Sequence, residues 1–297
     1  MPDNPLPFEP HIDPRRENFV VIGSCISRAI CFVLTLSEQF RSHFNVINYW
    51  SANPNNVMSD FKIDWNLLAS AKVIMYHPPG WSSWGKEETY VKLAANISSN
   101  SLGITFPYPS LTAFWPFFVQ EPRNLEENTI RNPMQHPRRF PQGDSYILAQ
   151  LRKGEKSPSE IVEQYVNLDI SEMVDLNELM LGNLMTMLSK EKETDIKVVD
   201  FIKENYQTKT CFQSAPHISN DIVLHLANQV LKKCGYAPLK ESILDSYSEL
   251  VMHEVPIHPS VIRHFDLKFL DEKYRYQVDF WWRPTFEEYV ENYVRFL

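Results

Sequence analysis

The sequence predicts an α/β fold: a central, mostly parallel sheet flanked by helices in three layers, with a helical middle section and an aromatic C-terminal extension. Short apolar runs at 19–22, 45–49 and 72–76 are separated by helical or irregular segments. This alternation is typical of parallel strands joined by right-handed crossovers. The first run is entirely apolar, as expected of a strand buried on both faces.

The first strand is predicted to end in a tight turn that leads into a helix. The run closes at Gly23, and apolar residues then recur at helical spacing from Ile26 to Phe40. The third run ends at His77, which precedes a Pro-Pro-Gly turn. Because sites in parallel sheets lie beyond the carboxyl ends of the strands, Cys25 and His77 both fall at the expected site edge.

The middle of the chain changes from irregular to helical. Segment 102–120 is aromatic and interrupted by prolines, which predicts a short strand followed by an irregular wall, and the next stretch, up to Gln142, is expected to be a loop. Ser157 opens a capping box followed by a helix. Two more helices are expected at 171–190 and near 197–206.

The last third is predicted to hold two more helices. Ser219 is expected to cap one that ends at Gly235, and Thr285 to open the other with a second capping box. The aromatic residues around the last helix are expected to dock the tail on the core. The expected organisation is an N-terminal arm at 1–18, one α/β catalytic domain at 19–270 and a C-terminal extension at 271–297.

Composition limits the classes of partner. The 37 acidic and 29 basic side chains give a formal charge of −8, which argues against broad binding of nucleic acid or an anionic membrane. The chain has no apolar stretch of about eighteen residues and no signal-like start, so a cytoplasmic location without a membrane span is expected. The four cysteines form no C-x-x-C pair and the histidines show no compact ligand spacing, so no metal is expected.

The triplet Gly23-Ser24-Cys25 is the most informative candidate for chemistry. It would present Ser24 and Cys25 at a helix N-terminus, where free amides and the helix dipole lower a thiol pKa and can hold an oxyanion. The alternative is a buried cysteine that only packs the turn. His217, just ahead of the Ser219 cap, can handle the proton of a nucleophile or an incoming hydroxyl, or can simply pack there.

Other polar residues have weaker signals. His77 can orient substrate or donate to an oxyanion, or it can shape the turn. Asp144 is expected to be the N-cap of the helix that follows it. Arg28, Arg138 and Arg139 are candidates for binding the phosphates of a cofactor, with a solvated basic surface as the alternative.

Taken in order, several segments resemble the WcbI family of polysaccharide-biosynthesis enzymes, named for a capsule-producing acetyltransferase. They extend from Phe19 to Phe269 and include VVIGSCISRAI, AKVIMYHPPG, ITFPYPSLTAFWPFF, FQSAPHISNDIVLHLANQVLKKCG and VPIHPSVIRHFDLKF. The resemblance implies an α/β fold, binding of coenzyme A or acetyl-CoA, and transfer of an acetyl group to a sugar or glycan precursor. Cys25 matches the family cysteine and His217 the histidine, while Ser24 replaces an asparagine.

A fainter likeness is to the SGNH hydrolases, whose fold has the flavodoxin-like three-layer arrangement. Their nucleophile follows a first strand in a Gly-Asp-Ser turn, and a late block has the form Asp-x-x-His. Here Cys25 stands at the nucleophile position, and Ser214 stands where the aspartate that orients His217 is expected. An SGNH-like esterase, and a non-catalytic glycan- or partner-binding protein with the aromatic wall 106–118 as its surface, are therefore the alternatives to an acyltransferase.

Overall fold

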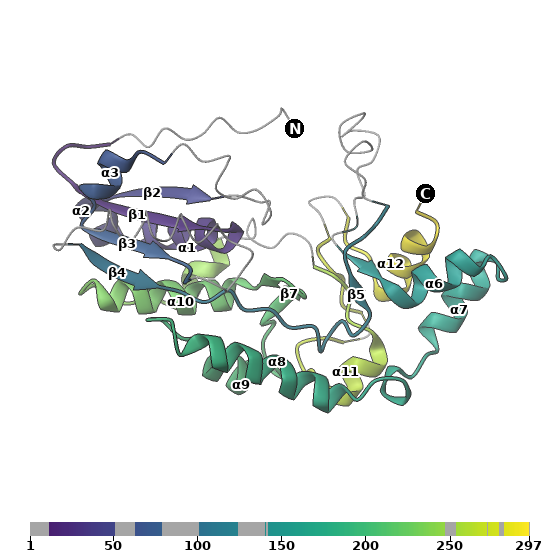
Figure 1. Cartoon of the computed structure of the whole chain (residues 1–297). Coiled ribbons are helices and arrows are strands. Elements are labelled where there is room, and N and C mark those ends of the chain that lie inside the picture. Colours follow the sequence, from purple (N-terminus) through teal and green to yellow (C-terminus); the bar gives the residue numbers. More distant parts are fainter. Residues whose placement is uncertain are drawn as a thin grey trace.

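A four-stranded parallel sheet forms the centre of the fold, with the order β2-β1-β3-β4 (Figure 1). This confirms the predicted α/β class. The strands are β1 (Glu17–Gly23), β2 (Phe44–Trp50), β3 (Val73–Tyr76) and β4 (Leu102–Thr105). The computed structural model describes residues 12–50, 63–78, 101–123, 140, 142–246, 254–271, 273–278 and 282–296.

Strand β1 lies between two hydrophobic clusters. Phe19 and Val21 belong to the larger cluster, and Val20 and Ile22 to the smaller one on the other face. The first three of these residues have no exposed surface. The alternation shows that the sheet is covered on both sides, as the apolar run 19–22 predicted.

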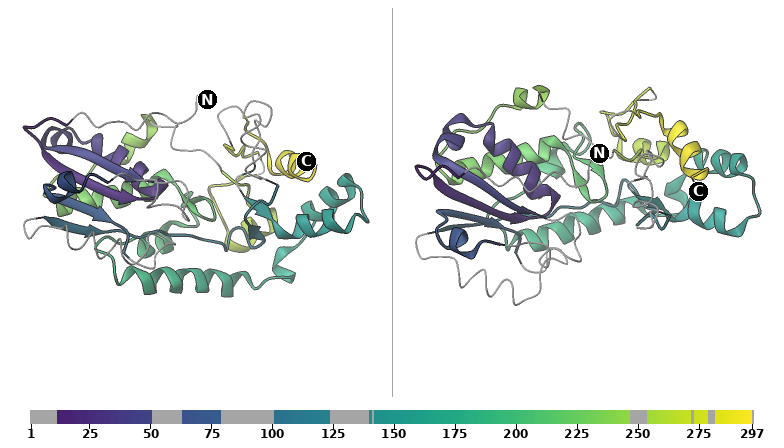
Figure 2. Two further views of the ribbon diagram at one scale, coloured as in Figure 1. Left: turned by 45° about the horizontal axis from the view of Figure 1, so that its top comes forward. Right: turned by 90° about the horizontal axis from the view of Figure 1, so that it is seen from above.

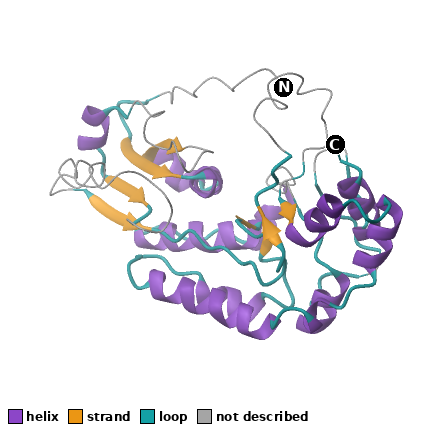
Figure 3. Ribbon diagram, turned by 45° about the vertical axis from the view of Figure 1, so that its right-hand side comes forward, coloured by secondary structure: helices purple, strands orange, loops and turns teal. Residues whose placement is uncertain are grey.

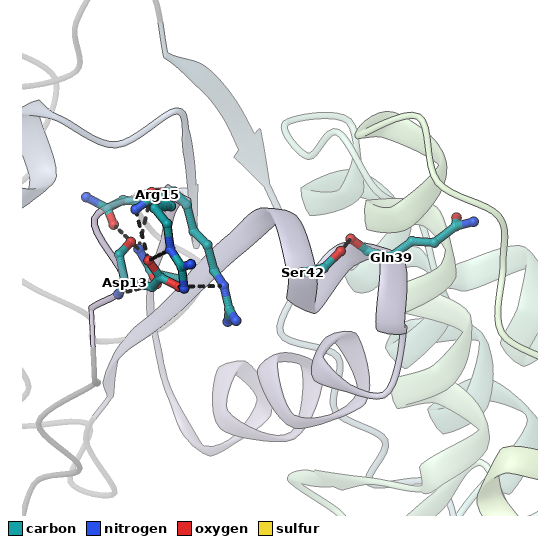
Figure 4. Close-up of polar contacts among 7 residues, drawn as sticks. Asp13, Arg15, Gln39 and Ser42 are labelled. Carbon is teal, nitrogen blue, oxygen red and sulfur yellow. Dashed lines mark hydrogen bonds and ion pairs between the residues drawn. The ribbon is translucent and has the colours of Figure 1, made fainter.

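The segment before β1 is fastened to the start of β2. The amide of Asp13 donates to Asn45 Oδ1 at 3.0 Å, and Asn45 Nδ2 donates to the Asp13 carbonyl at 3.0 Å. Arg15 forms an ion pair with Asp13 at 2.7 Å, which holds the pKa of that carboxyl well below its usual range (Figure 4). Figure 4 also shows the bond from Ser42 Oγ to the Gln39 carbonyl in the nearby helix.

The helix predicted from Ile26 to Phe40 is divided in two. Helix α1 spans Cys25–Thr35, and a second helix, α2 (Glu38–His43), begins after Ser37. Ser37 has an extended backbone, and its side chain accepts a hydrogen bond from the amide of Phe40. A serine that competes with the helix for backbone donors favours such a restart. The prediction was therefore correct in type and wrong in continuity.

Both predicted capping boxes are present. Ser157 and Glu160 exchange the two bonds of the first, and Thr285 and Glu288 those of the second. Gly235 leaves the helix after Ser219 with φ +82°, as expected of a glycine exit. The later helices are α6 (Ser145–Lys153), α7 (Pro158–Val166), α8 (Leu176–Glu191), α9 (Val199–Asn205), α10 (Asn220–Lys233), α11 (Pro259–Phe265) and α12 (Phe286–Val294).

Other elements depart from the prediction. The helix expected at 171–190 is a short 3-10 turn, Ile170–Glu172, followed by α8, because Asp175 caps α8 through the amide of Glu178. Two short hairpins and two short helices were not predicted, since segments this short carry little periodic signal. The hairpins are β5 (Phe118–Val119) with β6 (Gly143–Asp144) and β7 (Phe212–Ser214) with β8 (His217–Ile218). The helices are α3 (Trp65–Ala69) and α11 (Pro259–Phe265).

Two groups of elements are visible in the ribbon views. The sheet with α1, α2, α3 and α10 forms one group, and α6, α7, α11 and α12 gather away from it, with α8 and α9 alongside (Figures 1 and 3). Helix α12 packs on α7, and the ring of Phe140 contacts Tyr289 and Tyr293 at 5.2 and 5.0 Å. Within the described ranges, no helix is long and apolar enough to cross a membrane.

We expect Ser157→Ala to lower the free energy of unfolding by about 1 kcal/mol, because the amide of Glu160 loses the serine hydroxyl that accepts its hydrogen bond. Ser189→Ala on the exposed side of α8 is a suitable control, and its change should stay within about 0.5 kcal/mol. Urea unfolding measures both. Equal stability of the two variants would show that the box contributes nothing.

Candidate active site

The candidate site lies at the carboxyl edge of the sheet, at a topological switch point. The chain leaves β1 toward β2 on one side and then crosses over to β3 on the other side of β1. Ligands of open α/β sheets bind where the connections diverge in this way. Ser24 and Cys25 follow β1 there, and His77 follows β3.

Gly23 is required by the close approach of helix α1 to the end of β1. A Cβ added at this position would lie 2.2 Å from Cβ and 2.5 Å from Oγ of Ser27, and 3.0 Å from the ring of Phe106. Ser27 cannot move away easily, because its hydroxyl donates to the Ser24 carbonyl at 2.6 Å. The glycine therefore brings the first turn of the helix directly over the sheet edge.

Ser24 and His77 form a buried polar pair. His77 Nδ1 lies 3.0 Å from the carbonyl oxygen of Phe106, which can only accept, so Nδ1 carries the ring proton. The Ser24 hydroxyl then donates to Nε2 at 3.4 Å. Burial lowers the pKa of His77 to about 3, so the ring stays neutral. This arrangement fits a residue that positions Ser24 rather than one that donates to an oxyanion.

The Cys25 thiol is partly buried at the first position of α1. Burial raises its pKa, and the opposing effects of the Ile26 and Cys25 amides and the Ser24 hydroxyl are smaller. The expectation that the helix terminus leaves a thiol of lowered pKa is therefore wrong for this structure. The amides nevertheless point at the sulfur, where they can stabilise negative charge.

Tyr108 is a site residue that the sequence analysis did not single out. Burial raises its pKa to about 12, and the charge of the nearby Cys25 acts in the same direction. Its ring meets that of His77 edge-on, with centroids 5.7 Å apart. The only available signal was a tyrosine three residues after a predicted strand, inside a segment that was interpreted as a wall.

A serine hydroxyl contacts the ring of His217. The hydroxyl of Ser214 lies 2.7 Å from His217 Nδ1, and Ser214 is only 1% exposed. The two residues face each other across the tight β7–β8 hairpin. Since a hydroxyl can donate or accept, it fixes the orientation of the ring without imposing the charge that an aspartate would.

The packing of the helices brings the His217 hairpin to the same edge as Cys25. Helices α1 and α10 pack against each other and both start at this edge (Figures 1 and 2). The amide of Leu111 donates to the carbonyl of Ala215 at 2.9 Å, which ties the hairpin to the segment that carries Tyr108. A direct contact between the thiol and the imidazole stays a prediction.

The predicted cofactor-binding arginines are placed only in part. Arg28 is exposed on α1, one turn after Cys25. Arg138 and Arg139 lie outside the described residues. Among the residues that the structure describes, no group of His, Cys, Asp and Glu side chains could hold a metal ion. Asp144 caps α6 through the amide of Ile147 at 2.9 Å, as predicted.

Fold and site together define an α/β protein with a cysteine turn at the switch point of a parallel sheet. The family model described as polysaccharide biosynthesis enzyme WcbI matches residues 18–239, which is most of the sequence. The chain therefore belongs to the WcbI family of polysaccharide biosynthesis enzymes, and the resemblance predicted from the sequence is confirmed.

A solved structure supports the fold. It is that of WcbI, a novel polysaccharide biosynthesis enzyme, as the native protein without a disulfide bond between coenzyme A and one of its cysteines. The TM-score is 0.68 at 16% identity, and the alignment covers 94% of this chain and 89% of that one. No curated protein matches the sequence significantly.

We expect Gly23→Ala to lower the free energy of unfolding by about 1–3 kcal/mol, because the added methyl group overlaps Ser27. Gly103→Ala in β4 is the matched control, since a Cβ there meets nothing within 4 Å. Thermal unfolding of the two variants measures the difference. If Gly23→Ala is as stable as Gly103→Ala, the close approach is not a constraint.

The raised pKa of Cys25 predicts slow alkylation at neutral pH. Iodoacetamide should modify Cys25 more slowly than free cysteine at pH 7, and the rate should rise as the pH passes 9.0. Peptide mass spectrometry follows the modification of this thiol separately from the others. A midpoint below about pH 8 would show that the helix amides outweigh burial.

Proposed function

We propose that this protein transfers an acetyl group from coenzyme A to a sugar hydroxyl during the synthesis of a capsule or another polysaccharide. Membership of the WcbI family supports the polysaccharide class of substrate. The observation that carries the proposal is the turn at Gly23, which sets the Cys25 sulfur and two backbone amides at the switch point of the sheet. The hairpin of His217 lies at the same edge.

The cysteine turn is the proposed position of the thioester. For WcbI, a disulfide between coenzyme A and a cysteine is described as absent from the native protein, and we propose that Cys25 lies beside the coenzyme A sulfur in this chain. An acetyl carbonyl oxygen placed there would accept from the amides of Cys25 and Ile26. These donors are fixed by the helix before the reaction begins, so little reorganisation opposes the growth of negative charge.

Direct transfer is the route that we favour. The acceptor hydroxyl loses its proton to His217 as its oxygen bonds to the acetyl carbon, and the carbon–sulfur bond of the thioester breaks. Coenzyme A leaves as a thiol with the proton that His217 returns. The raised pKa of Cys25 keeps that thiol protonated at neutral pH, which disfavours a covalent acetyl-enzyme.

His217→Ala is expected to lower the rate of acetyl transfer by about 10²–10⁴-fold with little change in coenzyme A binding, because general base catalysis is lost. The assay follows thiol release from acetyl-CoA in the presence of candidate sugars. His264→Ala, on the exposed side of α11, is the control and should keep full activity. Normal turnover of His217→Ala would remove this residue from the mechanism.

The two routes differ in whether Cys25 is ever acetylated. Direct transfer predicts no acetyl group on Cys25 when enzyme and acetyl-CoA are quenched in acid and analysed by mass spectrometry. A stoichiometric acetyl-Cys25 would establish the covalent route instead. An SGNH-like esterase would hydrolyse an aryl acetate rapidly and would not bind coenzyme A.

Coenzyme A should stabilise the protein in a thermal-shift titration, and replacing Arg138 and Arg139 together by alanine should weaken that effect. Their guanidinium groups are the proposed partners of the phosphates. Arg41→Ala, in α2, is the control. Unchanged affinity of the double variant would remove both arginines from the site.

A further inference from the structure

A cavity lies among the elements away from the sheet, between the β5–β6 hairpin, α7, the start of α11 and α12. Its wall contains the aromatic side chains of Trp115, Phe117, Tyr165, Phe286, Tyr289 and Tyr293. None of the candidate catalytic residues lines it. Its volume is about 40 Å³, which is enough for about three water molecules. The cavity therefore suits a small substituent of a ligand.

Two polar groups, the Asp144 carboxyl and the Tyr289 hydroxyl, belong to residues that line this aromatic cavity. Asp144 accepts from the amide of Ile147 at 2.9 Å and from the hydroxyl of Tyr165 at 2.5 Å, and burial raises its pKa to about 6. The Tyr289 hydroxyl is buried and has no hydrogen-bond partner among the described residues. Burial is the main cause of the raised pKa of Tyr289, the charge of Asp144 adds to it, and both residues line the cavity.

The carboxyl group in the described wall of the cavity disfavours an anionic ligand next to it. Among the described residues no lysine or arginine lines it, Arg123 beside Tyr293 is paired with Glu121, and Asp144 becomes a carboxylate above about pH 6. His258 donates from Nε2 to the Tyr165 carbonyl at 2.8 Å, and its Nδ1 accepts from the amide of Ser260 at 3.1 Å, so its ring is neutral. A neutral group that both donates and accepts is therefore favoured next to Asp144 and Tyr289.

The cavity is connected to the His217 hairpin. Gln142 lines the cavity, and its Oε1 accepts from the amide of Ala215 at 3.4 Å. Ala215 directly follows Ser214, whose hydroxyl holds His217. A glycan with one substituent anchored in the cavity would thus lie close to the proposed acceptor position.

We propose that this cavity receives the acetamido group of an N-acetylated amino sugar in the acceptor glycan, an inference that rests on the proposed function. An acetamido group has one acceptor for the Tyr289 hydroxyl and one donor for the Asp144 carboxylate. Its methyl group matches the aromatic wall, and its four non-hydrogen atoms match the size of the cavity. A hydroxyl in the same position would leave the methyl-sized part of the cavity unfilled.

The test is a saturation-transfer NMR titration with N-acetylglucosamine, glucosamine and glucose. N-acetylglucosamine should bind at least about 10-fold more tightly than the other two sugars, and Tyr289→Phe should remove about 10-fold of its affinity by deleting one hydrogen bond. This variant is expected to fold, because the hydroxyl has no hydrogen-bond partner in the part of the chain that the structure describes. Tyr236→Phe, beside Phe40 in the other group of elements, is the control and should bind normally.

Equal binding of glucose and N-acetylglucosamine, no binding of either sugar, or unchanged affinity of Tyr289→Phe would overturn the inference. Coenzyme A titrations of the same samples separate it from the proposed function. If coenzyme A binds and the preference for the N-acetyl sugar is absent, only the acetamido site fails. If that preference is present and coenzyme A does not bind, the site stands and acetyl transfer fails.

Discussion

The arrangement of this protein depends on the close contact between the end of β1 and the first turn of α1. Gly23 has no side chain to separate them, and the Ser27 hydroxyl holds the turn by its bond to the Ser24 carbonyl. Because the helix starts immediately over the strand, the sulfur of Cys25 and the free amides are delivered together to the edge of the sheet. The buried runs on either face of β1 keep that edge fixed.

Burial shifts the pKa values of His77 and Cys25 in opposite directions. The ring of His77 is enclosed and neutral, so it can hold the Ser24 hydroxyl without adding charge. The thiol of Cys25 is partly removed from water, and its neighbouring amides do not make up for that loss. Ionisation of the sulfur is thus unfavourable in the resting protein, while the amides stay available to another negative group. These properties support the proposal that the turn binds a reacting carbonyl.

Local chemistry made several features predictable. The strand at 19–22, the glycine turn and the capping boxes at Ser157 and Thr285 follow from side-chain spacing and hydrogen-bonding groups within a few residues of each other. The break at Ser37 escaped prediction because the apolar spacing continues across it, although the backbone does not. Tyr108 escaped for a different reason: no local signal marks a tyrosine whose importance comes from a cysteine about eighty residues earlier in the chain.

The sequence alone determined the α/β class, the position of Cys25 at a strand–helix turn and the family resemblance, since each depends on short-range patterns or their order. Only the tertiary structure decided that the Ser214 hydroxyl contacts the ring of His217, that His77 supports Ser24, and that burial raises the pKa of Cys25. Hydrogen bonds between distant segments and the loss of water around a thiol are results of packing. They depend on which residues meet in space, and a one-dimensional pattern does not contain that information.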